Sequence, residues 1–173
     1  MNTDPLTTGV DNIMVQKMDD FGNFNETSGL FNISKSEFQY KFKLLNETFS
    51  SGIVFIHNNK LLLVHDSNKD WNNTCSFPKG HIEENETIAQ CAIREVSEEI
   101  GIGYPLENIK NKEPNICYLF KEEEFKTYYY FIIYLNNKEW KKYFNVYTIP
   151  KENLQLEEID WAGFVEKDKA EKM

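Results

Sequence analysis

Three glutamates, Glu95, Glu98 and Glu99, lie close together in a segment with regularly spaced apolar residues. Burying ionised carboxylates together is unfavourable unless a cation neutralises them. Carboxylate oxygens favour a hard ion, magnesium or manganese ahead of calcium, and such an ion can hold phosphate oxygens and activate a bound water. An isolated acidic cluster is more often a solvated helix face, so the interpretation depends on the surrounding residues.

The segment from Thr87 to Ile100 is predicted to be a helix. Thr87 and Gln90 have the spacing of a capping box, and Gly101 is a good helix terminator. The apolar residues repeat at i, i+4 along one stripe: Ile88, Ala92, Val96 and Ile100. At about 100° per residue, Glu95 and Glu99 fall close to this stripe and Glu98 on its edge. The three carboxylates should project within roughly a third of the helix circumference.

The residues around the helix form a longer pattern. Gly80 is followed by five residues and Glu86, then by seven residues and the run Arg94-Glu-Val-Ser-Glu-Glu-Ile-Gly-Ile102. This arrangement resembles the box of the Nudix hydrolase superfamily, and every specified position is matched. The resemblance covers roughly residues 51–165. It implies an α/β fold, an α/β/α sandwich with a mixed sheet, in which the box forms a loop, a helix and a second loop.

The resemblance also implies roles for residues of the box. Glu95, Glu98 and Glu99 look like ligands of Mg²⁺ or Mn²⁺, joined by the Gly80 carbonyl, and Arg94 looks like the residue that orients the glutamates. The implied reaction is attack of water on a phosphorus within a diphosphate linkage. Candidates for the catalytic base are Glu95, Glu98 or an acidic residue outside the box: Glu122–Glu124, Glu157–Glu158 or, less favoured, Asp160.

Resemblances to two subfamilies imply different substrates. The loop Phe77-Pro-Lys-Gly-His-Ile-Glu83 resembles that of diadenosine tetraphosphate hydrolases, which implies a dinucleoside polyphosphate as the small-molecule nucleotide substrate. Ser76-Phe-Pro-Lys-Gly80 with Cys91-Ala-Ile-Arg-Glu-Val96 also resembles messenger-RNA decapping enzymes, whose partner is capped RNA. Diphosphoinositol polyphosphate hydrolases rank lower, because they carry a glycine-rich stretch at the position of Pro78-Lys79. A catalytically silent binding module of this fold is the remaining alternative, but the three glutamates are intact.

The same resemblance to diadenosine tetraphosphate hydrolases suggests substrate contacts. Lys79 and Lys126 would contact phosphates, and Tyr128 or Tyr130, in the aromatic run 127–135, would stack on a base. Ordinary sheet packing is the simpler interpretation of any single tyrosine.

Composition restricts the partners. The net charge of −9 and the pI of about 4.9 argue against extensive nucleic-acid binding, and so against DNA. A small anionic substrate remains compatible, because bound cations reverse the local charge of a site. No apolar run could span a membrane and the first residues lack a secretory pattern, so a cytoplasmic protein is expected. The cysteines Cys75, Cys91 and Cys117 should be reduced, with the last two buried.

The chain is expected to divide into a loosely ordered arm, residues 1–37, and a hydrolase domain, residues 38–173. An extra strand is suggested at 38–45, a hairpin at 52–57 and 60–65, and strands at 115–120, 127–135 and 159–165. Both faces of the strand at 127–135 are apolar, which predicts cover on both sides. A short helix is expected around Trp140 and a charged one at 166–172.

Overall fold

The computed structural model describes residues 13–14, 30–31, 46–121 and 124–173 of the 173-residue chain. The extra strand suggested at 38–45 lies outside the described residues, as does all of the arm except two short strands. The described residues fall into two compact units. The first contains residues up to 49 together with 117–128, and the second contains 50–116 and 129–173.

One sheet has the order β5-β4-β3-β8-β7, with β6 paired to β3 and β9 paired to β4. Its strands are β3 (Asn46–His57), β4 (Lys60–Asp66), β5 (Cys75–Ser76), β6 (Lys79–His81), β7 (Asn115–Lys121), β8 (Glu124–Tyr134) and β9 (Ile159–Glu166). The helices are α2 (Ile88–Ile100), α3 (Asn137–Tyr143) and α4 (Lys167–Ala170), with short 3₁₀ turns η1 (Leu106–Asn108) and η2 (Lys151–Asn153). This combination of sheet and helices confirms the α/β class.

The first unit contains β1 (Ile13–Met14) paired antiparallel with β2 (Leu30–Phe31), and the ends of β3, β7 and β8. Tyr118 and Phe125 stack with ring centroids 5.6 Å apart. Cys117 is exposed, so its expected burial is wrong: the strand that carries it turns this side chain outward.

The hairpin of β3 and β4 forms where the sequence predicts it. Asn58 and Asn59 connect the strands with φ angles of 46° and 61°, values that asparagine tolerates better than most residues. The register pairs Ile56 with Leu61 and His57 with Lys60. On the outer side of the hairpin, β4 pairs with β9 along its whole length, with an irregularity between His65 and Asp66.

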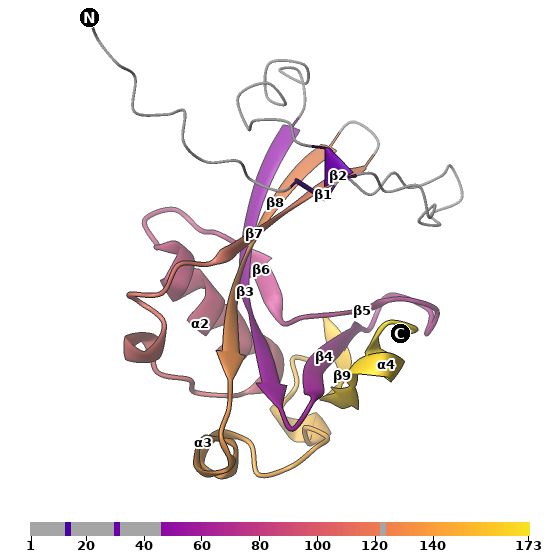
Figure 1. Cartoon of the computed structure of the whole chain (residues 1–173). Helices are drawn as coiled ribbons and strands as arrows, with labels where there is room; N and C mark the ends of the chain where they lie inside the picture. Colours follow the sequence, from indigo (N-terminus) through magenta and orange to yellow (C-terminus); the bar gives the residue numbers. More distant parts are fainter. Residues whose placement is uncertain (1–12, 15–29, 32–45, 122–123) are drawn as a thin grey trace, which may run out of the picture. The chain divides into compact units, whose positions relative to one another are not determined.

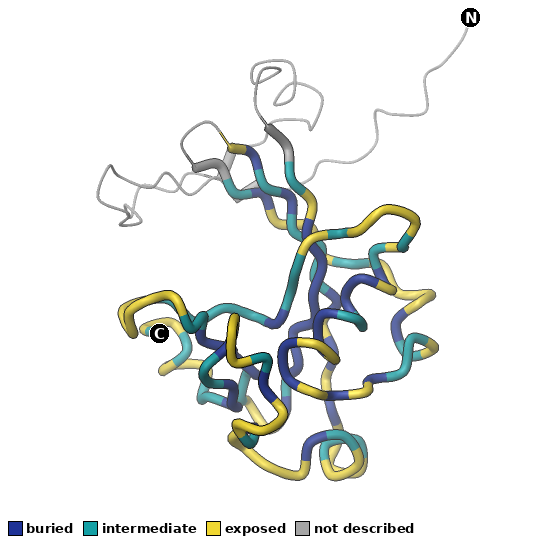
Figure 2. The backbone as a smooth tube through the Cα atoms, turned by 180° about the vertical axis from the view of Figure 1, so that it is seen from behind, coloured by how far each residue is buried: buried dark blue, intermediate teal, exposed yellow. Residues whose placement is uncertain are grey.

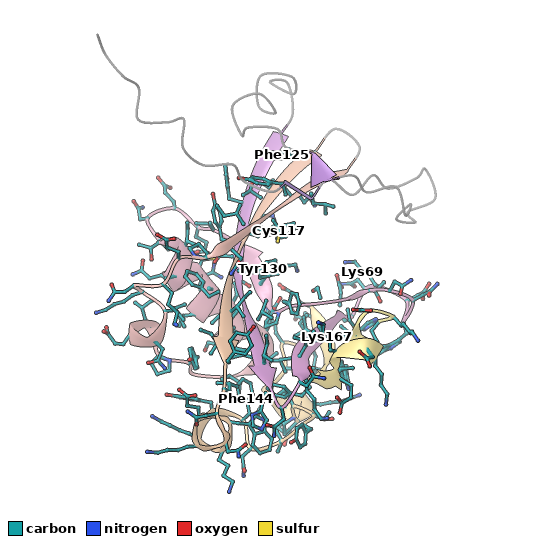
Figure 3. The ribbon with its side chains drawn as sticks, viewed as in Figure 1. Lys69, Cys117, Phe125, Tyr130, Phe144 and Lys167 are labelled. Atoms are coloured by element: carbon teal, nitrogen blue, oxygen red, sulfur yellow. The ribbon has the colours of Figure 1, made fainter. Side chains whose placement is uncertain are left out.

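The core of the second unit lies between the sheet and α2. It includes Ile53, Phe55, Val96 and Ile100, all fully buried, and Phe144, which packs edge-on against Phe55. Figure 2 colours the buried backbone dark blue, and Figure 3 labels Phe144. The two faces of β8 differ within this unit. Side chains at 131 and 133, and at 135 just beyond the strand, are buried, whereas those at 132 and 134 are exposed, so the predicted cover on both sides is wrong for this end of the strand.

Figure 1 shows α2 on one side of β3, with β4, β9 and α4 on the other. The helix contacts β6, β9 and η1. No helix among residues 13–14, 30–31, 46–121 and 124–173 is long and apolar enough to cross a bilayer.

Candidate active site

The ends of α2 fix which side chains face the sheet. The Thr87 hydroxyl accepts from the Gln90 N–H at 3.2 Å, and the Gln90 side chain accepts from the Thr87 N–H at 2.8 Å, which completes the capping box. At the other end Gly101 adopts φ 69° and donates its N–H to the Ser97 carbonyl. Both ends of the predicted helix are therefore confirmed, and they fix the direction in which its acidic side chains point.

Two of the three glutamates are buried. Glu95 is 8% exposed and Glu99 is 4% exposed, one helical turn apart, whereas the Glu98 side chain is 51% exposed. The pKa of Glu99 is raised to about 8, mainly by burial; Lys79 opposes this increase, and the charges of Glu95 and Glu158 add to it. Burial also raises the pKa of Glu95, although Arg94 opposes this. The chain thus buries more negative charge here than its own cations neutralise.

Arg94 connects the acidic side chains of the box. Its guanidinium donates to Glu86 at 2.7 and 3.1 Å, to Glu95 at 2.7 Å and to Glu98 at 2.9 Å. It also donates to the His81 carbonyl at 2.9 Å, which ties the helix to the loop before it. The hydrogen bonds from Arg94 lower the pKa of Glu86, whose carboxylate also accepts from the Glu83 N–H. Arg94 and Glu86 therefore hold the loop and the helix together.

The backbone of β6 lies directly against the buried glutamates. The Lys79 N–H donates to Glu99 Oε2 at 3.0 Å. The strand is held by β3, since Ser51 pairs with Gly80, and Gly52 allows the close approach because a Cβ there would lie 2.1 Å from the Pro78 carbonyl oxygen. The glycine of the box therefore lies beside the helix glutamates through its pairing with β3.

Gly80 leaves space that a larger residue would take from Glu95. A Cβ at Gly80 would lie 2.1 Å from the Glu95 carboxylate. Gly80→Ala is therefore expected to displace that carboxylate and to lower kcat at least about 100-fold, a loss of the size seen when a site is misplaced by about an ångström.

Gly103→Ala is the matched control, because a Cβ at Gly103 meets nothing within 4 Å. Steady-state kinetics and melting temperatures of both variants test this. Equal kinetics for the two alanine variants would contradict the assigned contact.

The donor set fits a hard divalent ion. The buried carboxylates of Glu95 and Glu99 offer only oxygen, which magnesium and manganese prefer. The carbonyl of Gly80, the other predicted ligand, accepts from the Cys91 thiol at 3.5 Å. Within the described part of the chain, no three acidic, histidine or cysteine side chains already surround a common point. Arg94 contacts Glu95 and Glu98 in this arrangement. The raised pKa values of Glu95 and Glu99 are what a bound cation would reverse.

The predicted substrate contacts separate into two groups. Lys79 adjoins the buried glutamates, and Tyr130 packs edge-on against Phe77 with centroids 5.5 Å apart, in the same unit as the box (Figure 3 labels Tyr130). Lys126 and Tyr128 belong to the first unit. There Lys126 is ion-paired with Glu124 at 3.2 Å, and burial raises the pKa of Tyr128.

Among the acidic residues outside the box, Glu158 lies close enough to raise the pKa values of both Glu95 and Glu99, after burial itself. Its segment is held beside the helix, because the Gln155 N–H donates to the Glu99 carbonyl at 3.1 Å. Sequence reasoning did not identify His65 and Trp71, which stack on each other with centroids 3.8 Å apart. A histidine in a strand followed by a tryptophan in a polar loop gave no recognisable motif.

Comparison with known proteins agrees with this geometry. A family model described as NUDIX domain matches residues 48–170. A NUDIX hydrolase from Nitrosomonas europaea is 18% identical, with a TM-score of 0.53 over 73% of this chain and 76% of that chain. The MutT NUDIX hydrolase of Burkholderia pseudomallei is 13% identical, with a TM-score of 0.54 over 71% and 85%. An Ap4A hydrolase binary complex from C. elegans is 22% identical, with a TM-score of 0.46 over 71% and 82%.

No curated protein matches the chain by sequence. The solved structures share the fold at low identity, and the family model spans most of the chain, including the whole box from Gly80 to Ile102. Enzymes of this family use divalent metals and hydrolyse diphosphate linkages of nucleoside diphosphate derivatives. The chain therefore belongs to the NUDIX family and is a Nudix pyrophosphohydrolase.

Proposed function

We propose that the chain hydrolyses a dinucleoside polyphosphate of the diadenosine tetraphosphate type, with Mg²⁺ or Mn²⁺ held by Glu95, Glu98, Glu99 and the Gly80 carbonyl. The observation that carries the metal assignment is the pair Glu95 and Glu99, buried one turn apart against the backbone of β6. When bound, the metal would supply charge stabilisation to the phosphoryl oxygens and lower the pKa of a water.

The chain's own residues would orient and bind. Arg94 donates to Glu95 and Glu98 through one nitrogen, which sets the direction of both carboxylates. Lys79 is anchored by its backbone to Glu99, which leaves its ammonium group as a phosphate contact. In the proposed reaction water attacks a phosphorus, a P–O–P bond breaks, and diadenosine tetraphosphate gives ATP and AMP.

Among the described residues we favour Glu95, Glu98 and Glu158 as candidates for the base that takes the proton of the attacking water, whereas the candidates Glu122 and Glu123 lie outside the described residues. Glu95 and Glu98 both accept hydrogen bonds from Arg94, which orient their carboxylates. Glu158 lies outside the box, is exposed, and its charge reaches Glu95 and Glu99. Its neighbour Glu157 is also exposed and carries the same side chain, so the two residues form a matched pair.

Glu158→Gln is expected to lower kcat by about 100-fold, the usual contribution of a general base, while Glu157→Gln changes it less than about threefold. The pH profile of kcat/KM is measured for both variants. Equal and small effects would exclude Glu158 and leave Glu95 and Glu98.

The substrate assignment rests on the loop Phe77–Glu83 and on its surroundings. Phe77 and Tyr130 form an aromatic pair beside Lys79, which combines an apolar surface with a cation. An apolar aromatic surface next to a cation suits a nucleotide, whose base can stack and whose phosphates carry negative charge. A capped RNA would need a basic groove. In the described part of the chain, the most basic surface is a short cluster of exposed lysines on α3: Lys138, Lys141 and Lys142.

The test offers purified protein with magnesium three substrates side by side: diadenosine tetraphosphate, a capped RNA and the free cap dinucleotide. Release of ATP and AMP from the first, with capped RNA untouched, supports the proposal. Release of 7-methyl-GDP from capped RNA would assign the chain to decapping instead. A diphosphoinositol polyphosphate is included as a fourth substrate, and preferential release of phosphate from it would also overturn the proposal.

A further inference from the structure

Trp71 is a large aromatic side chain that remains 57% exposed, in the loop between β4 and β5. Its ring lies parallel to the His65 imidazole, with an interplanar angle of 2° and centroids 3.8 Å apart. Trp161 approaches it at 68° with centroids 5.7 Å apart. Trp71 is therefore fixed by two aromatic neighbours, while more than half of its surface faces solvent.

His65 supplies a rigid base for this ring. It is fully buried in β4, and its Nδ1 lies 2.7 Å from Asp160 Oδ1 on the neighbouring strand β9. The strand register breaks just after His65, between His65 and Asp66. Such irregularities redirect the chain, and they are frequent beside active sites. The loop that carries Trp71 starts at this point.

The beginning of this loop contacts the segment that carries Glu158. The Ser67 N–H donates to the Glu158 carbonyl at 2.7 Å, and the Glu158 side chain is the one whose charge reaches Glu95 and Glu99. Asp66 is also within electrostatic reach of Lys79. Figure 3 labels Lys69, which lies in the same loop. A nucleotide bound by Lys79 and the glutamates can therefore extend toward Trp71.

The charges around Trp71 favour a neutral planar group over a phosphate. Two carboxylates, Asp66 and Asp70, come shortly before Trp71 in the sequence, and Asp160 contacts the His65 ring on which Trp71 stacks. The cation of this loop, Lys69, is already paired with Asp66 at 3.0 Å. Carboxylates repel phosphate, but they accept hydrogen bonds from the amino groups of a base. Every base offers a flat π-face for stacking on an aromatic ring.

We propose that the exposed face of Trp71 is a stacking surface for a nucleobase of the substrate, held in place by His65, Asp160 and Trp161. The inference rests on the proposed nucleotide hydrolysis and names a specificity-determining residue for it. The base is recognised by stacking, so removal of the indole weakens binding of nucleotides and leaves binding of a sugar phosphate unchanged.

The test measures binding of AMP and of ribose 5-phosphate to the full chain with magnesium, by calorimetry and by tryptophan fluorescence. We expect AMP to quench the emission and ribose 5-phosphate not to. Trp71→Ala should weaken AMP binding by about tenfold or more, the size of one base–aromatic stack, and Trp71→Phe should restore it to within about threefold. Neither variant should change the affinity for ribose 5-phosphate.

Trp140→Phe is the matched control. Trp140 also stacks on a strand histidine, His57, at 6° and 4.9 Å, but it is only partly exposed and Tyr147 lies against it. AMP affinity and quenching should survive this change. AMP binding that is absent in the wild type, or unchanged in Trp71→Ala, would overturn the inference. Because AMP is not hydrolysed, this result does not depend on whether diadenosine tetraphosphate is the substrate.

Discussion

Glu99→Gln is expected to lower kcat by on the order of a thousandfold at saturating magnesium, because it removes a charged oxygen donor that the chain cannot replace. Glu99 is the most buried of the three glutamates, and its Oε2 already accepts the Lys79 N–H. Glutamine can keep that hydrogen bond through its carbonyl oxygen. The loss should therefore appear in catalysis and metal affinity while the fold is retained.

The measurement is kcat and KM as a function of magnesium concentration, with circular dichroism to check the fold. Glu84→Gln is the control, since Glu84 is an exposed glutamate of the same loop–helix region outside the box pattern. It should retain kcat within about twofold. Full activity of Glu99→Gln, or turnover that persists in EDTA, would show that the metal assignment is wrong.

The helix and its acidic face were predictable because local rules determine both. Thr87 and Gly101 fix the two ends of α2, and helical periodicity then places Glu95 and Glu99 toward the core and Glu98 toward solvent. The hairpin was equally local, since two asparagines with positive φ join β3 to β4. The short helix around Trp140 is confirmed as α3, with Asn136 and Glu139 as its capping box.

The errors arise where tertiary pairing overrides composition. The strand β3 begins at Asn46, six residues before its predicted start, because its polar first half carries no alternation that a sequence could reveal. The strand β8 likewise begins at Glu124, three residues before its predicted start at Thr127. The exposure of Ile132 and Tyr134 shows that an apolar strand face need not be covered at its end.

The candidate site also combines features that local sequence determines with contacts that only tertiary pairing determines. The box residues are contiguous enough for a pattern to identify them, and the contact between Gly80 and Glu95 follows from it. The stacking of Trp71 on His65 depends on the register between β4 and β9, which brings Asp160 to His65 from about a hundred residues away. No spacing rule in the sequence specifies that contact. The roles proposed for Lys126 and Tyr128 stay predictions.

Without metal, the stability of the protein should depend on pH, and the sign of this dependence follows from the raised pKa of Glu99. The pKa of the Glu99 carboxyl is raised by burial from its usual 4.5 to about 8 in the metal-free fold. A raised carboxyl pKa means that the folded state prefers the proton, so the folded state is relatively stabilised at low pH and loses this advantage as the pH rises from about 4.5 through about 8. Burial raises the pKa of Glu95 too, with the same sign.

In EDTA, the melting temperature of the wild type is therefore expected to fall between about pH 6 and about pH 9, by on the order of 5–10 °C. Magnesium should restore it, and more strongly at the higher pH, because the ion neutralises the carboxylates that are ionised there. Glu99→Gln removes most of the pH dependence and most of the magnesium effect, and should melt above the wild type in EDTA at about pH 8. The same substitution would then stabilise the metal-free fold and abolish turnover, which is expected of a carboxylate buried for metal binding at the expense of stability. A metal-free melting temperature that is independent of pH, or lowered by Glu99→Gln, would contradict this account of the site.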